Sequence, residues 1–68
     1  MSSLNDRELT EYAFKEAMSR HRHMSVKLKT IFKSTSDRSI KKLCAILLSS
    51  CDSRMAMLQR EMKNLNIK

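Results

Sequence analysis

The sequence predicts an all-α protein, an antiparallel two-helix hairpin that dimerises into a four-helix bundle. The 68-residue chain contains no glycine and no proline, the residues that most often interrupt helices and form tight turns. Apolar residues recur every three or four positions on both sides of a serine-rich stretch at 34–36, which is the period of a helix. So short a chain forms a single domain over residues 1–68, and it buries too little surface to be stable alone.

A first helix is predicted over residues 6–33. Asn5 precedes it and carries a side chain suited to capping a free backbone amide. Glu8, three residues later, completes the pattern of a capping box. The apolar stripe of this helix consists of Phe14, Ala17, His21, Met24, Leu28 and Ile31.

A second helix is predicted over residues 37–64, with Ser36 followed by Asp37 as its cap. Its stripe takes two successive steps of four residues at Leu47, Cys51 and Met55, a stutter that locally unwinds a supercoil. One continuous helix through the serines is the alternative to a turn, because no residue there forbids it. The predicted stripe consists of Ile40, Leu43 or Cys44, Leu47, Cys51, Met55 and Leu58.

Folding the chain at 34–36 matches the two stripes position by position. Met24 is then expected near Leu47, and His21 near Cys51. Further apolar residues widen the stripe beyond what one partner helix covers, so we expect two hairpins to close on each other as a homodimer. These widening residues are Met18, Phe32, Leu48, Met55 and Met62.

A polar cluster is predicted to interrupt the apolar seam. Arg54 falls within the apolar sector of the second helix, about 20° from Leu47 on a helical wheel. Since buried polar groups need partners, we expect Arg54 to pair with Glu16, Glu61 or a backbone carbonyl. The predicted buried polar cluster consists of His21, Ser50, Cys51 and Arg54.

The two cysteines are interpreted as reduced packing residues. Cys44 and Cys51 lie seven residues apart, about 10 Å along one helix, which is too far for a disulfide between them. A disulfide between chains stays open if the dimer axis passes close to one of them. A zinc site across the dimer is disfavoured, because His21 and His23 point about 200° apart and the cysteines lack metal-binding spacing. We therefore expect no metal and no other cofactor.

A family-like pattern runs from Glu11 to Leu65. It comprises the turn Ser36-Asp37, the run from Ile40 to Leu43, and the pair Met57-Leu58. In this order the segments resemble one helical hairpin of a ferritin-like, rubrerythrin-type bundle. That family's Glu-x-x-His motif falls on the positions from Cys51 to Arg54, and its first-helix carboxylate falls near His21, so its metal ligands are replaced. The resemblance implies a dimer of hairpins without di-iron chemistry.

Positive charge is concentrated in the middle of the chain. The formal net charge is +7, and residues 20–42 hold eight lysines and arginines against the single acid Asp37. A basic stripe at spacings of seven, seven and four is formed by Lys15, Arg22, Lys29 and Lys33. It is suited to contact a phosphate backbone or an acidic protein groove, and the alternative is a helix face that only contacts solvent. Electrostatic partner binding is predicted for Lys15, Arg22, Lys29, Lys33, Arg38, Lys41 and Lys42.

The sequence favours a small regulatory or adaptor protein over an enzyme. It has no glycine for a phosphate loop and no paired carboxylates in the predicted seam. We expect a cytoplasmic protein that binds an acidic protein partner and no membrane. A Rop-like hairpin dimer that binds RNA or DNA through a basic helix face is the alternative, although aromatic residues are few. Apolar partner contacts are predicted for the outward residues Tyr12, Val26, Ile46 and Met57.

Overall fold

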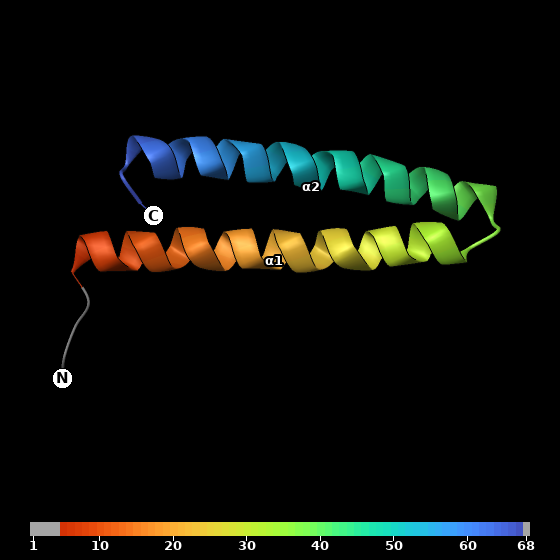
Figure 1. The fold of residues 1–68 in the computed structure, drawn as a ribbon, viewed down its shortest axis with the longest axis horizontal. Helices are drawn as coiled ribbons and strands as arrows, with labels where there is room; N and C mark the ends of the chain where they lie inside the picture. The colour runs from red at the N-terminus through yellow and green to blue at the C-terminus, as the bar shows by residue number, and fades with distance from the viewer. Residues whose placement is uncertain (1–4, 68) are drawn as a thin grey trace.

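The computed structural model describes residues 5–67, which form two antiparallel helices joined by a short turn (Figure 1). Helix α1 spans Asp6–Ser34 and helix α2 spans Arg38–Asn64. They lie side by side along their whole length, so the start of α1 and the end of α2 share one end of the molecule. We name that end the base and the turn at 35–37 the tip. The hairpin is thus shown, and a single continuous helix is excluded.

Local hydrogen bonds fix both ends of α1. The Asn5 side chain accepts a hydrogen bond from the backbone N–H of Glu8 at 2.8 Å, as its capping role predicts. Asp6 and Glu8 place negative charge in the first turn, where the helix dipole favours it. At the other end, the backbone N–H of Thr35 donates to the carbonyl of Ile31 at 2.9 Å.

The cap of α2 is Asp37, one residue later than the predicted Ser36. Its carboxylate accepts hydrogen bonds from the backbone N–H groups of Ser39 at 2.8 Å and Ile40 at 3.1 Å. The hydroxyl of Thr35 accepts the backbone N–H of Asp37 and so positions this cap. Asp37 is the better cap because its negative charge also complements the positive end of the helix dipole.

Replacing Asp37 with alanine is expected to destabilise the hairpin by about 1 kcal/mol, because two backbone amides lose their acceptor. For a domain of this size that corresponds to a melting temperature lower by roughly 4–8 °C, measurable by circular dichroism at fixed protein concentration. Asp52→Ala is the matched control, since Asp52 is exposed within α2 and caps nothing. Equal melting temperatures for the two variants would contradict this role of Asp37.

The base is closed by a left-handed turn after α2. Asn66 adopts a φ of 58°, a conformation that asparagine tolerates better than most residues. The backbone N–H groups of Asn66 and Ile67 then donate to the carbonyls of Lys63 and Met62, which is the Schellman arrangement. Ile67 is buried, and the Arg7 guanidinium donates to the carbonyl of Asn66 at 2.9 Å. These contacts join the two ends of the described chain.

The seam between the helices is built largely from small side chains. Its buried members alternate at helical spacing, with Leu28, Cys44 and Cys51 forming the core and half-buried Leu48 packed against them. No side chain among residues 5–67 is completely buried, so the single hairpin has a thin core. The buried residues of the two helices are Met18, Ser25, Leu28, Cys44 and Cys51.

The structure corrects the predicted seam. Met24 and Ile31 on α1 are exposed instead of buried, and so are Ile40 and Leu47 on α2. Ser25 and Leu48, their immediate neighbours in sequence, occupy the seam. This shift of one residue places the smaller Ser25 in the seam instead of Met24, and it restores alternating steps of four and three along α2. The predicted stutter in α2 is therefore wrong, and of the alternatives Leu43 and Cys44 the seam contains Cys44.

No helix within residues 5–67 is long and apolar enough to cross a membrane.

Candidate interaction surfaces

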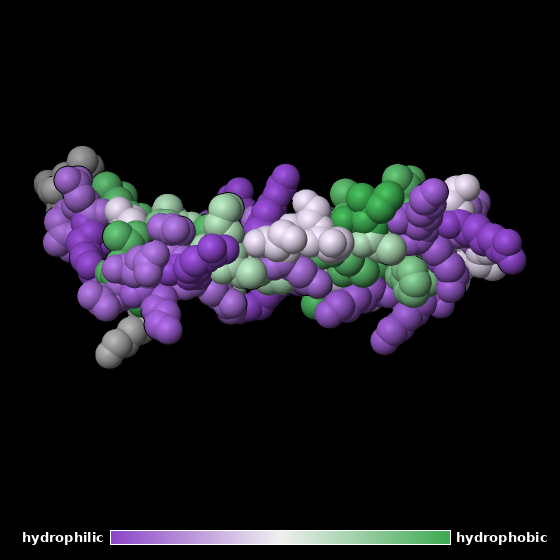
Figure 2. Space-filling model, turned by 90° about the horizontal axis from the view of Figure 1, so that it is seen from above, coloured by the Kyte–Doolittle hydropathy of each residue, from purple (hydrophilic) through white to green (hydrophobic). Residues whose placement is uncertain are grey.

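An exposed apolar area covers one side of the half nearest the tip (Figure 2). Both helices contribute to it. The exposed fractions of Leu43, Leu47 and Met24 are 59%, 50% and 50%, values typical of surface residues although the side chains are those of a core. We name this surface the apolar face, and it consists of Met24, Ile31, Ile40, Leu43 and Leu47.

Helix geometry and a shared groove place these residues on one side. Met24 and Leu47 line the same groove between the helices. Ile31 follows Met24 by seven residues and Ile40 precedes Leu47 by seven, which is two helical turns in each case. All four side chains therefore project from the same side of the hairpin.

The groove continues the apolar face toward the middle of the molecule, with a volume of about 370 Å³. Arg20 lies on its rim, while Met24, Leu28 and Leu47 form its apolar wall. The structure thus brings the predicted polar cluster together around a single groove. The cluster residues that line it are His21, Ser50, Cys51 and Arg54.

Burial of this cluster is only partial, which corrects the sequence prediction for a single hairpin. Cys51 is buried and His21 is half-buried, whereas Ser50 and Arg54 are exposed. The reason is again the one-residue shift of the seam. With Leu48 in the seam, Ser50 and Arg54 stand on the open side of the groove, where water can solvate them.

The predicted pairing of Arg54 is also wrong for a single hairpin. Within residues 5–67 the salt bridges are Arg7–Glu11 and Arg20–Glu16, each at 3.2 Å and each between successive turns of α1. Glu16, one expected partner of Arg54, is thus held by Arg20 instead. Both pairs are exposed, so each contributes little to stability.

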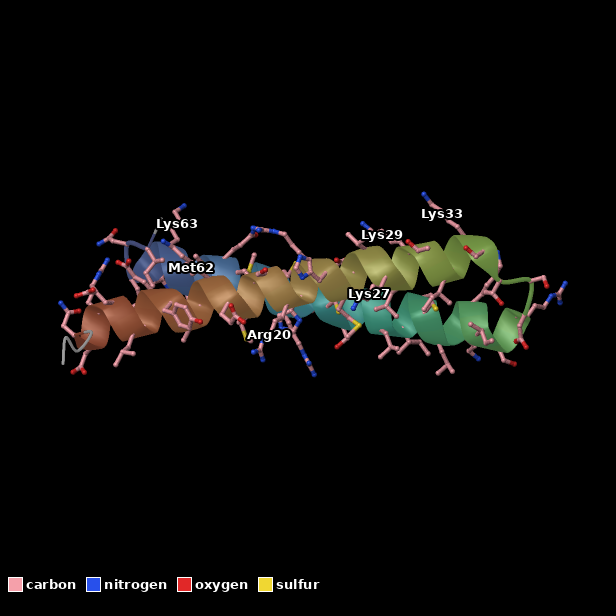
Figure 3. All side chains as sticks on the ribbon, turned by 90° about the horizontal axis from the view of Figure 1, so that it is seen from below. Arg20, Lys27, Lys29, Lys33, Met62 and Lys63 are labelled. Atoms are coloured by element: carbon pink, nitrogen blue, oxygen red, sulfur yellow. The ribbon has the colours of Figure 1, made fainter. Side chains whose placement is uncertain are left out.

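A basic face lies on the side of the hairpin opposite the apolar face. Figures 2 and 3 view the molecule from opposite sides, so the upper edge of one picture is the flank opposite the upper edge of the other. The hydrophobic group lies at the upper edge of Figure 2, and Lys29 and Lys33 lie at the upper edge of Figure 3. Arg20 points to the other flank, as its place on the groove rim requires. The basic face comprises Lys15, Arg22, Lys29 and Lys33, all exposed.

The basic residues around the tip differ in their surroundings. Arg38 and Lys42 are exposed, in keeping with a role in contacts with a partner. Lys41 is half-buried, and its Nζ lies 4.9 Å from the centre of the Phe32 ring, within range of a cation–π interaction. Lys41 therefore also has a structural role, covering the aromatic ring at the end of the seam.

The four apolar residues predicted to contact a partner are exposed, but they do not form one patch. Tyr12 and Val26 lie on the outer side of α1, fourteen residues apart. Ile46 and Met57 lie on the outer side of α2. Because these outer sides face away from each other, one partner surface does not reach all four residues.

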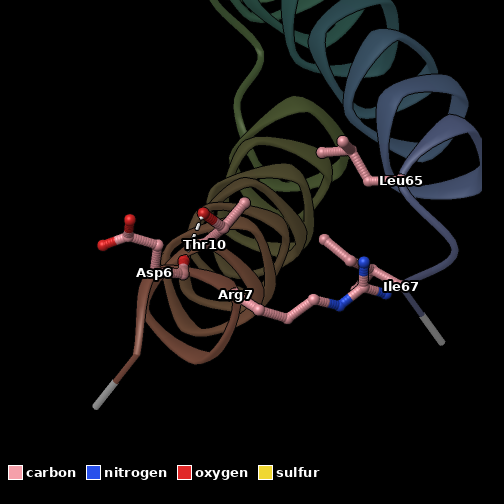
Figure 4. Close-up of a pocket in the computed structure, with 5 residues that line it drawn as sticks. All are labelled: Asp6, Arg7, Thr10, Leu65 and Ile67. Atoms are coloured by element: carbon pink, nitrogen blue, oxygen red, sulfur yellow. Dashed lines mark hydrogen bonds between the residues drawn. The ribbon is translucent and has the colours of Figure 1, made fainter.

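A smaller pocket of about 180 Å³ lies at the base (Figure 4). It is bounded by Arg7 and Thr10 of α1 and by Leu65 and Ile67 after α2. The Thr10 hydroxyl donates to the carbonyl of Asp6 at 2.7 Å, so its hydrogen is already used. This pocket belongs to the packing that joins the two helix ends.

Both thiols are free and buried in the seam, as the packing interpretation of Cys44 and Cys51 predicts. Within residues 5–67, no group of three or more histidine, cysteine or acidic side chains is placed to hold a metal ion. Comparisons with protein-family models, with characterised proteins and with solved structures find no match to this chain. Inferences about function therefore rest on its surfaces.

Proposed function

We propose that this protein is a small, non-enzymatic regulatory or adaptor protein that acts as a homodimer and binds an acidic surface of a protein partner. The separation of its two surfaces is the observation that carries the proposal. Apolar side chains gather on one side of the hairpin and unpaired positive charges on the other. The first surface suits permanent association and the second suits electrostatic recognition.

The basic face is available to a partner because nothing within the described chain neutralises it. Asp37 is the only acid among residues 20–42, and its carboxylate already accepts two backbone amides as the cap of α2. The nearest ion pair, Arg20–Glu16, lies on the other flank. Like charges crowded together oppose folding, and a partner of opposite charge relieves that repulsion.

The homodimer is supported by the thin core of a single hairpin. Only Met18, Leu28 and Ile67 are large apolar residues buried within residues 5–67, whereas five remain on the apolar face. Full burial of a side chain of this kind stabilises a protein by roughly 1.5–3 kcal/mol. The five residues of the apolar face are 41–59% exposed, so covering them offers about half of that free energy for each, a large gain for a hairpin with so thin a core.

Binding of RNA or DNA is the second candidate function, favoured by the spacing of the basic face. Lys15, Arg22 and Lys29 follow one another at intervals of seven residues along one helix, a line of charge that suits a phosphate backbone. Recognition of single-stranded bases requires exposed aromatic rings. Tyr12 is well exposed, at 65%, but Phe32 is only 37% exposed beside Lys41 and Phe14 is half-buried. A single well-exposed ring gives little surface for stacking bases, which favours the protein partner.

The double variant Arg22→Glu with Lys29→Glu tests the basic face. We expect unchanged helicity and dimerisation, because both residues are exposed away from the seam and the apolar face. Association with the partner is expected to slow by roughly tenfold or more at low salt, and its salt dependence to flatten. The control reverses two exposed basic residues near the base, Arg60 and Lys63, for the same change of charge; Lys63 lies on the same flank as Lys29 and Lys33 (Figure 3), so the control tests position along the hairpin.

The partner for this measurement comes from a pull-down in the native host with nuclease treatment. A partner retained after nuclease supports protein binding. Loss of the partner, together with an affinity that falls steeply and log-linearly with salt, identifies nucleic acid instead. Wild-type association rates for the Arg22→Glu, Lys29→Glu variant at every salt concentration would show that the basic face is only a solvated surface.

A further inference from the structure

The apolar residues beside the seam form one column on each helix. Each column residue directly precedes a seam position and therefore projects from the same flank of its helix. Near the tip these positions are apolar on both helices, and toward the base they become small or polar. From base to tip the α1 column reads Thr10, Ala17, Met24, Ile31; from tip to base the α2 column reads Ile40, Leu47, Arg54, Glu61.

We infer that a second copy of this chain covers the apolar face with the two tips at the same end of the dimer. The two-fold axis then runs parallel to the helices, and each α1 packs against α2 of the other copy in the opposite direction. The inference rests on the homodimer proposed above and adds the orientation of its two copies.

Matching of the two columns decides this orientation. Within one hairpin, Met24 and Leu47 line the same groove and so lie at the same height. With both tips at one end, Met24 of each copy therefore lies against Leu47 of the other. The residues two turns nearer the tip, Ile31 and Ile40, meet in the same way.

The reverse orientation, with each tip over the other copy's base, matches these columns poorly. It places Ile40 against Glu61 of the second copy and Ile31 against Thr10. Burying a carboxylate under an isoleucine is unfavourable, because the charge loses water and gains no partner. With the tips together, Arg54 instead faces Ala17 of the second copy, whose small side chain leaves room for the arginine.

A consequence of this orientation is a dimer with one strongly basic end. Each copy brings the positive charges of residues 20–42 to that end, and the two basic faces point outward on opposite sides. Repulsion between the tips opposes dimerisation and is screened by salt. The dimer is therefore expected to tighten as salt rises, opposite to the binding of an acidic partner.

Distance measurement between spin labels tests the orientation. Ser36 in the tip is exposed, so a label on Ser36→Cys in a Cys44→Ala, Cys51→Ala background reports the distance between tips. With tips together the labelled backbones lie about 10–15 Å apart across the bundle. In the reverse orientation they lie about 40 Å apart, which is the length of one helix at 1.5 Å per residue.

The unsubstituted protein provides a second measurement that requires no variant to fold. Sedimentation equilibrium is expected to show a dissociation constant several-fold smaller in 0.5 M than in 0.05 M sodium chloride. A dimer that weakens with salt, or labels about 40 Å apart, would overturn the orientation and leave the homodimer intact. A helical monomer of 8.0 kDa at micromolar concentration would overturn both. Docking by the basic face is tested separately by the Arg22→Glu, Lys29→Glu variant.

Discussion

Replacing Leu47 with glutamate is expected to dissociate the dimer. Leu47 is half exposed in the single hairpin and lies at the centre of the apolar face, beside Met24. Two such leucines leave the interface at once, and each contributes about half of the roughly 1.5–3 kcal/mol of full burial, because half of its surface is already covered in the hairpin. The dissociation constant should therefore rise by about 10–10²-fold, with further weakening from the buried charge.

Ile46→Glu is the matched control, because the two positions are neighbours. Ile46 has an exposed fraction of 56% against 50% for Leu47, but it projects from the outer side of α2. The two substitutions thus add the same charge at nearly the same exposure on different faces. If sedimentation shows the same dissociation constant for both variants, the apolar face is not the dimer interface.

Helicity provides a further readout of the Leu47→Glu variant. Because the single hairpin has a thin core, its helices are expected to depend on dimerisation and so on protein concentration. Circular dichroism of the variant should show lost helicity at low micromolar concentration and partial recovery on concentration. Full helicity in a monomeric variant would show that the seam alone is sufficient for folding.

The local rules of helix formation and the matched apolar stripes were sufficient to predict the two-helix hairpin from the sequence. Asn5 caps α1 as expected, and the absence of glycine and proline leaves no interruption in either helix. The cap of α2 shows the limit of such rules. Ser36 and Asp37 are both good caps, and the charge of Asp37, together with its hydrogen bond to the Thr35 hydroxyl, decides between them.

The seam was harder to predict because, near the tip, apolar residues also stand directly before the seam positions, as Met24 does before Ser25 and Leu47 before Leu48. Judged by hydrophobicity alone, Met24 is a better core residue than Ser25, and the structure nevertheless buries Ser25. Packing accounts for the reversal, since small side chains let two helices approach closely and align the remaining contacts. A helical wheel contains no information about that approach distance.

The sequence predicts only part of the candidate site. The spacing of His21, Cys51 and Arg54 indicated that they meet, and they line one groove. Their burial was not predictable, because it depends on which apolar column faces the second helix. The same ambiguity conceals the apolar face, because the sequence pattern predicts a seam position for its residues.

Leu28→Ala is expected to have the largest effect on the stability of the hairpin itself. Leu28 is 6% exposed and belongs to the core with Cys44 and Cys51. Truncating a buried leucine costs about 2–5 kcal/mol, through lost transfer free energy and the cavity left behind. Small domains are stable by only about 0.05–0.15 kcal/mol per residue, so this loss consumes much or all of the stability of the chain.

Leu9→Ala is the control that separates the effect of removing a buried leucine from the effect of removing any helical leucine. Leu9 is 51% exposed in the first turn of α1, where a change to alanine is expected to alter stability by at most about 0.5 kcal/mol. Thermal melts at one fixed protein concentration compare the two variants, since dimerisation couples stability to concentration. Leu28→Ala should melt at least about 6 °C lower than Leu9→Ala, given a difference of about 1.5 kcal/mol or more and roughly 4–8 °C for each kcal/mol. If both variants have the same melting temperature, the helices do not pack through this seam. The distinction between the seam and the apolar face, on which the proposed dimer depends, would then be wrong.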